Sequence, residues 1–170
     1  MKEIIFITGG QRSGKSSQGQ RLALERSDRP LYLATARQWD DDFNKRIARH
    51  RSDRGEGWET IEEEKNIGSL NLEGKTVLLD CVTLWLTNIF HDTGYDLERS
   101  LDLAKAEWKK LTSGDFRLIV ISNEVGMGVI PDNEISRKFA DLQGWMNQHI
   151  AAMASTVIFM VSGIPHVIKS

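Results

Sequence analysis

The chain has 170 residues, of which 22 are Lys or Arg and 24 are Asp or Glu, so its formal net charge is −2. A charge so close to zero provides no positive field that would attract nucleic acid or an anionic membrane surface. The apolar runs are strand-sized and too short for membrane insertion, and the single cysteine, Cys81, excludes an internal disulfide. We expect one domain over residues 1–170 and, because no cationic leader precedes the first apolar run, a cytoplasmic protein.

The first predicted element is a strand over residues 4–8, which leads directly into a glycine-rich turn. The turn matches the P-loop pattern, whose backbone amides and helix N-terminus surround the phosphates of a nucleotide triphosphate. In this pattern the lysine reaches the β- and γ-phosphates and the serine hydroxyl ligates Mg²⁺. An ordinary glycine-rich turn would not require that lysine and serine. The predicted phosphate-binding residues are Gly9, Gly10, Gln11, Arg12, Ser13, Gly14, Lys15 and Ser16.

A helix is predicted over residues 17–27, followed by a short strand over 31–35. Ligands of open parallel sheets bind beyond the carboxyl ends of the strands, so the exit of this strand is a candidate contact, although an ordinary loop also explains it. Residues 40–50 begin with acids and end with bases, as suits a helix dipole. We interpret the acidic run as a helix start rather than a metal site. The residues alone favour a solvated helix end at His50.

A short strand is predicted over residues 58–62 and an apolar strand over 76–80, which ends in Asp80. An acid at this place is typical of the magnesium-binding aspartate of P-loop proteins. Cys81 follows, and we interpret it as a buried packing residue rather than a nucleophile. Helices are predicted over 81–88 and 97–111.

The strand predicted over residues 117–122 is almost continuously apolar, which indicates burial on both faces. Two glycines and an acid in residues 123–128 predict a shaped loop on the active face, with a simple turn as the alternative. A helix over 133–155 carries an apolar stripe that is core, a subunit contact or both, and a strand over 156–161 follows. Alternating strands and helices predict an α/β fold: a P-loop NTPase-like three-layer arrangement with a mainly parallel, RecA-like sheet flanked by helices.

Four stretches, residues 8–16, 32–35, 46–58 and 122–131, together resemble one family. They are similar to the bifunctional adenosylcobinamide kinase / adenosylcobinamide-phosphate guanylyltransferases of cobalamin (vitamin B12) biosynthesis, and the likeness covers essentially the whole chain. The resemblance implies that ATP or GTP phosphorylates adenosylcobinamide. It also implies that His50 attacks the α-phosphate of GTP, releases pyrophosphate and passes GMP to adenosylcobinamide phosphate, which gives adenosylcobinamide-GDP.

The resemblance also implies a set of site residues and a homotrimer. His50 would be catalytic, Ser16 and Asp80 would hold Mg²⁺, and helix 133–155 or the region of Trp85 would join the subunits. Whether Glu62 or Asp80 reads guanine stays open. Because residue 50 is far along the chain from the P-loop, we expect its segment to fold over the site and to be mobile without nucleotide. The implied nucleotide contacts beyond the P-loop are Ala34, Thr35, Ala36, Arg51, Ser52, Asp53, Arg54, Glu62 and Asp80.

Two other functions fit the P-loop. A plain small-molecule kinase would use His50 only structurally and would form no acid-labile GMP adduct. A nucleotide-dependent switch or assembly ATPase would consume no corrinoid, and a protein partner would stimulate its hydrolysis of nucleotide.

Overall fold

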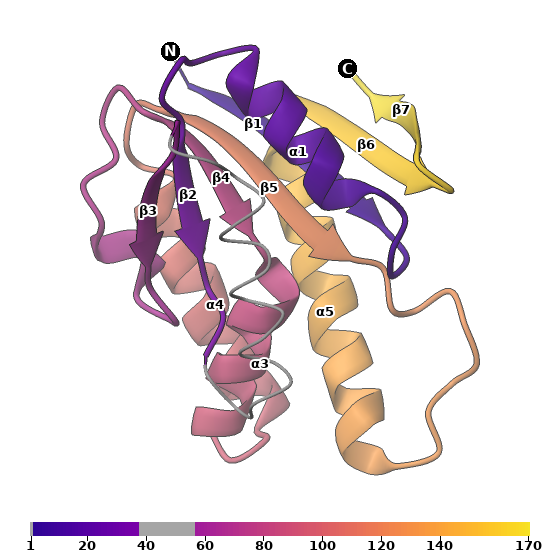
Figure 1. Cartoon of the computed structure of the whole chain (residues 1–170). Helices are drawn as coiled ribbons and strands as arrows, with labels where there is room; N and C mark the ends of the chain where they lie inside the picture. Colours follow the sequence, from indigo (N-terminus) through magenta and orange to yellow (C-terminus); the bar gives the residue numbers. More distant parts are fainter. Residues whose placement is uncertain (1, 38–56) are drawn as a thin grey trace.

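A computed structural model describes residues 2–37 and 57–170 of the chain (Figure 1). The described strands form one sheet in the order β3-β2-β4-β5-β1-β6-β7, in which every neighbouring pair is parallel except β6 and β7. The strands are β1 (Glu3–Gly9), β2 (Leu31–Ala34), β3 (Glu59–Glu62), β4 (Thr76–Asp80), β5 (Arg117–Asn123), β6 (Thr156–Val161) and β7 (Ile164–Lys169). The helices are α1 (Lys15–Leu24), α3 (Val82–Asp92), α4 (Leu97–Leu111) and α5 (Glu134–Met153), with a 3-10 turn η1 at Ile67–Ser69.

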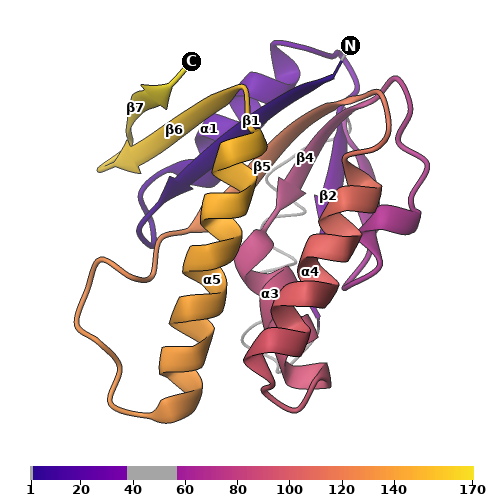
Figure 2. The ribbon, with the colours of Figure 1, turned by 180° about the vertical axis from the view of Figure 1, so that it is seen from behind.

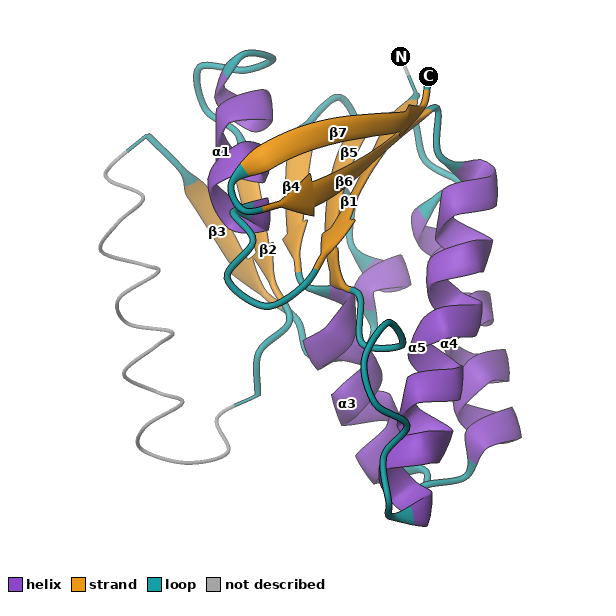
Figure 3. Ribbon diagram, turned by 90° about the vertical axis from the view of Figure 1, so that its right-hand side faces the viewer, coloured by secondary structure: helices purple, strands orange, loops and turns teal. Residues whose placement is uncertain are grey.

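Helices cover both faces of the sheet. Helix α1 lies on one face, and α3, α4 and α5 lie together on the other (Figures 1, 2 and 3). The apolar core is accordingly divided in two, with Trp85 and Trp108 on the three-helix side and Leu22 and Ala23 of α1 on the other. The predicted three-layer α/β fold with a mainly parallel sheet is therefore confirmed.

The boundaries of the main helices and strands lie close to those predicted from the sequence. Helix α4 occupies the predicted residues, and the interior of β5 is buried as its apolar run indicated. Asn133 is the N-cap of α5, where its side chain accepts a hydrogen bond from the Ser136 amide at 2.8 Å. The described helices include none that is long and apolar enough to cross a membrane.

The stripe of α5 is part core and part surface. Leu142, Met146 and Ile150 are fully buried, whereas Ile135 and Met153 near the two ends of the helix are 49% and 43% exposed. Trp85 corrects an expectation, because its side chain has no exposed surface and its indole donates to the Lys65 carbonyl at 2.9 Å. Trp85 itself therefore cannot supply a subunit contact.

One strand, β7, was not predicted from the sequence. Strand β7 follows a tight turn at Ser162 and Gly163, both with positive φ, and pairs antiparallel with β6 along the edge of the sheet. All six of its residues are exposed, so the strand has no buried face that would produce alternating apolar and polar residues in the sequence.

Candidate active site

The P-loop connects β1 to α1 as predicted. Gly9 and Gly14 have φ values of 153° and 95°, a region that residues with a Cβ rarely adopt. A Cβ on Gly9 would also lie 2.6 Å from the Met160 carbonyl oxygen, so this glycine is required by space as well. The Gly163 amide donates to the Ser13 carbonyl at 2.9 Å, which ties the turn between β6 and β7 to the P-loop.

Lys15 begins α1 at the inner side of this turn. Its side chain is largely buried, and its ammonium donates to the Gly10 carbonyl at 2.6 Å. Burial lowers the pKa of Lys15, while the nearby Cys81 and Asp80 act in the opposite direction. Lysine next to a turn of backbone amides gives a site whose charge and donors suit a phosphate chain.

Asp80 is the last residue of β4, and its side chain contacts the P-loop serine at the start of α1. Its carboxylate oxygen Oδ2 accepts hydrogen bonds from Ser16 Oγ at 3.2 Å and from the Tyr32 hydroxyl at 2.9 Å. Hydroxyl and carboxylate oxygens are the ligands that Mg²⁺ prefers, and such sites commonly use only one or two protein groups besides the phosphates. The described residues contain no cluster of three or more acidic, His or Cys side chains that would form an all-protein metal cage.

Cys81 is buried as predicted and stands next to Asp80. Burial, followed by the Asp80 charge, raises the pKa of its thiol to about 12. A thiol in that state is not a nucleophile at neutral pH, which supports the interpretation of Cys81 as a packing residue.

The carboxyl ends of three neighbouring strands line up beside this pair. Ala34 at the end of β2 is in register with Asp80 on one side and with Glu62, at the end of β3, on the other. Ala36 leaves the same end of β2. Predicted nucleotide contacts from separate parts of the chain thus share one edge of the sheet.

Thr35 has a structural role that the sequence did not indicate. Its side chain is fully buried, donates to the Cys81 carbonyl at 2.8 Å and accepts from the Cys81 amide at 3.0 Å. The Asn88 amide of α3 donates to the Thr35 carbonyl at 2.8 Å. These bonds fix the exit of β2 against the end of β4, so Thr35 positions its neighbours Ala34 and Ala36.

Arg37 is likewise more than a strand exit. Its guanidinium forms a bidentate pair with Asp92 at 2.8 and 3.0 Å and contacts Glu64 at 2.7 Å. Hydrogen bonds from Arg37, and then from Lys65 and His91, hold the pKa of Asp92 well below its usual range. This ion-pair cluster joins the segment after β2 to the end of α3.

The predicted site residues His50, Arg51, Ser52, Asp53 and Arg54, and the helix expected over 40–50, lie outside the described residues.

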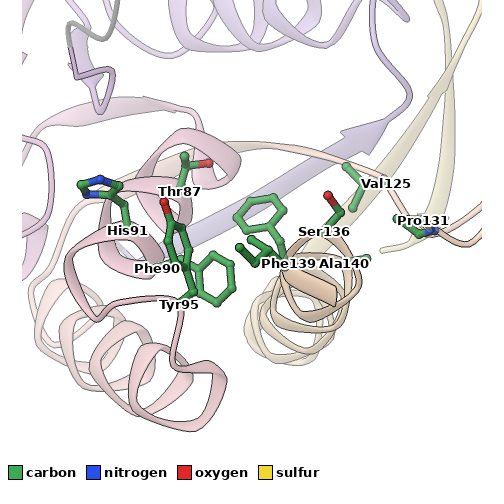
Figure 4. Close-up of a pocket in the computed structure, with 10 residues that line it drawn as sticks. Thr87, Phe90, His91, Tyr95, Val125, Pro131, Ser136, Phe139 and Ala140 are labelled. Carbon is green, nitrogen blue, oxygen red and sulfur yellow. The ribbon is translucent and has the colours of Figure 1, made fainter. Parts of the chain in front are cut away.

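The loop that follows β5 lies next to the P-loop. The Glu124 amide donates to the Gly9 carbonyl at 2.9 Å, and the Glu124 carboxylate accepts from the Gly126 amide at 2.8 Å. Next to it, a pocket of about 550 Å³ opens between α3 and α5. Figure 4 shows the rings of Phe90, Tyr95 and Phe139 gathered in this pocket, with Val125 at its other side.

Comparison with known proteins agrees with this geometry. A model of the cobinamide kinase / cobinamide phosphate guanyltransferase family matches residues 5–168. The chain belongs to this family. It is 40% identical to the bifunctional adenosylcobalamin biosynthesis protein CobP of Pseudomonas aeruginosa, over 99% of this chain and 98% of the relative. It is 36% identical to the bifunctional adenosylcobalamin biosynthesis protein CobU of Escherichia coli, over 98% and 99% of the two chains.

Among solved structures, the flagellar accessory protein FlaH of Methanocaldococcus jannaschii aligns with a TM-score of 0.48 at 14% identity. That alignment covers 98% of this chain and 78% of the FlaH chain.

Proposed function

We propose that this chain catalyses both reactions named by its family: phosphorylation of adenosylcobinamide by ATP or GTP, and transfer of GMP from GTP to adenosylcobinamide phosphate. The observation that carries the proposal is the family match over residues 5–168 in a chain whose P-loop is joined to Asp80. The products would be adenosylcobinamide-GDP and pyrophosphate, which places the enzyme in cobalamin biosynthesis.

In the kinase reaction the acceptor hydroxyl attacks the γ-phosphorus of the nucleotide and the diphosphate leaves. The amides of residues 9–16 and the Lys15 ammonium would hold the phosphate chain and stabilise the charge of the transition state. Ser16 and Asp80 would hold Mg²⁺, because they present two oxygen ligands next to the phosphate site. When bound, Mg²⁺ neutralises charge on the phosphates.

In the guanylyl transfer, His50 would form a nitrogen–phosphorus bond to the α-phosphate of GTP as the bond to pyrophosphate breaks. The phosphate oxygen of the corrinoid would then attack the same phosphorus and release His50. The arginines that flank His50 in the sequence would disfavour imidazolium and thereby favour the nucleophilic, neutral form. We assign Arg51, Ser52, Asp53 and Arg54 as further GTP contacts, and Ala34, Ala36 and Glu62 as the part of the site that extends toward guanine. The fully buried Thr35 would support this part of the site from behind.

We further propose that the protein acts as a homotrimer in the cytoplasm. Trp145 and Met153 on α5 are 45% and 43% exposed, and burying such side chains between copies would stabilise an oligomer. Sedimentation equilibrium would test this: a mass of three chains is expected, and a single-chain mass at micromolar concentration would contradict it.

Incubation with GTP and Mg²⁺ followed by intact mass measurement tests the proposed function. We expect a gain of one GMP, located at His50 by peptide mapping, and none in a His50→Ala variant that still phosphorylates adenosylcobinamide. An unmodified wild-type chain that phosphorylates the corrinoid would instead indicate a plain kinase. Labelling of the His50→Ala protein would exclude the role of His50.

A further inference from the structure

We propose that Glu124 is a catalytic residue of the kinase reaction, in which its carboxylate accepts the proton of the acceptor hydroxyl. The inference rests on the proposed function and assigns a group that the family name leaves open. Four features of the structure support it. They are the place of Glu124 beside the P-loop, the buried network that supports it, the hydrogen bonding of its carboxylate, and the pocket lined by the next residue, Val125.

Strand topology puts Glu124 next to the P-loop. Strand β5 lies between β1 and β4, and Asn123 is in register with Gly9, so the following residue begins beside the first residue of the P-loop. The hydrogen bond from the Glu124 amide to the Gly9 carbonyl fixes this position at 2.9 Å. Glu62, by contrast, ends β3, four strands from β1, which at about 4.8 Å per strand is roughly 19 Å away.

A buried polar network supports the end of β5 from behind. Gln143 of α5 donates to Ser122 Oγ at 2.8 Å and to Asn147 Oδ1 at 2.9 Å, and Ser122 Oγ donates to Asn147 Oδ1 at 2.7 Å. Asn147 in turn donates to the Asn123 carbonyl at 3.1 Å. Ser122 and Gln143 are fully buried. Through the Gln143 and Asn147 amides, these hydrogen bonds hold the end of β5 against α5, and this is the backbone that carries Glu124.

The carboxylates of the site divide into two roles. Asp80 is occupied by Ser16 and Tyr32, as suits a residue that holds a metal. Glu124 is half-buried, and its Oε1 accepts the Gly126 amide, which orients the group. Within residues 2–37 and 57–170, no side chain or amide donates to the other oxygen, Oε2. An oriented carboxylate with one open oxygen can accept a proton from an incoming hydroxyl.

The space beside Glu124 is suited to an alcohol attached to a large body that is partly apolar. Val125, the next residue, lines the pocket of about 550 Å³ between α3 and α5 (Figure 4). Phe90 and Phe139 line it with ring centroids 5.8 Å apart, and the side chains of Thr87 and Ser136 add hydroxyls. A substrate body in this pocket would contact Val125, and its hydroxyl would then need to extend only to the preceding residue, Glu124.

The step balances without a further reactant. The hydroxyl oxygen forms a bond to the γ-phosphorus while the bond from that phosphorus to the β-bridging oxygen breaks. The hydroxyl proton passes to Oε2 of Glu124, and the diphosphate leaves with the electron pair. Positioned bases of this kind contribute about 10²- to 10⁴-fold to a rate.

The two half-reactions give a test with an internal control, because only the kinase reaction needs this base. In Glu124→Gln we expect kcat for adenosylcobinamide phosphorylation to fall at least 100-fold, with the KM for nucleotide and the formation of the GMP adduct unchanged. Glu124→Asp keeps the acid and should be intermediate. The matched control is Glu134→Gln, at the exposed start of α5, which should phosphorylate like the wild type.

Three results would overturn the inference. Kinase activity of Glu124→Gln within threefold of wild type would show that the carboxylate is not the base. Equal losses in kinase activity and adduct formation would show that Glu124 is only structural. If the wild type itself gave neither phosphorylated corrinoid nor GMP adduct, the proposed function would fall and this inference with it, whereas wild-type activity in both assays tests Glu124 alone.

Discussion

Gly19 offers a sharp test of how α1 lies on the sheet. A Cβ at this position would come within 2.8 Å of Leu78 Cδ1 and 3.0 Å of Ile121 Cδ1, and both of those side chains are buried. A Gly19→Ala methyl therefore has no space unless the helix or its neighbours move. Gly144 in α5 provides the matched control, because a Cβ there meets no atom within 4 Å.

The expected effects on stability have opposite signs. Alanine improves the helix propensity of either site by about 1 kcal/mol relative to glycine. Overpacking a tight core costs about 1–3 kcal/mol, and this applies only to Gly19. Gly144→Ala should thus stabilise the protein by about 1 kcal/mol, and Gly19→Ala should be neutral or destabilising by up to about 2 kcal/mol. At roughly 2–4 °C per kcal/mol for a chain of this size, the two midpoints should differ by several degrees.

Thermal unfolding followed by circular dichroism measures the difference, and GTP titration adds a functional readout. Because α1 begins with Lys15 and Ser16, a shifted helix should weaken GTP binding in Gly19→Ala but not in Gly144→Ala. If Gly19→Ala raised the midpoint as much as Gly144→Ala does, the close packing of α1 on Leu78 and Ile121 would be wrong.

Three further predictions concern charged groups. Lys15→Met should weaken nucleotide binding at least tenfold in calorimetry, since it removes the buried ammonium at the P-loop; unchanged affinity would contradict the phosphate role. Asp80→Asn should raise the Mg²⁺ concentration needed for activity by roughly 10- to 100-fold, and an unaltered Mg²⁺ dependence would argue against this ligand. The pKa of Asp92 is held well below its usual range in the folded protein, chiefly by Arg37, so its stabilising effect is fully present above the unfolded pKa of about 3.9 and is lost progressively as the pH falls from there toward the folded pKa. Asp92→Asn should therefore lower the unfolding midpoint more at pH 7 than at pH 2, and equal effects at both would refute the linkage.

The parts of the site that could be predicted from sequence are those with local signals. An apolar strand followed by residues 9–16 predicts a P-loop by itself, and an apolar strand that ends in Asp80 predicts the second motif. Their contact through Ser16 was a reasonable expectation because parallel strands expose their carboxyl ends at one edge of the sheet.

Other features depend on three-dimensional neighbours. Gln143 and Asn147 occupy an apolar helix stripe as polar residues, and only the position of β5 shows that they support its end. The Arg37 partners Glu64 and Asp92 come from separate segments, so no spacing reveals the cluster. Strand β7 is an exposed edge, and Pro165 within it argues locally against a strand. Its apolar residues Ile164, Val167 and Ile168 do not alternate regularly with polar residues, so no period-two pattern marks the strand.

The hydrogen bond from Gly163 to the Ser13 carbonyl has a consequence for biosynthesis. During translation the P-loop leaves the ribosome early, yet one of the groups that shape it belongs to the turn between β6 and β7, which is made much later. A nascent chain that lacks this turn also lacks this support for the P-loop, so we expect nucleotide to stabilise the protein fully only after the turn has emerged and β6 has joined β1.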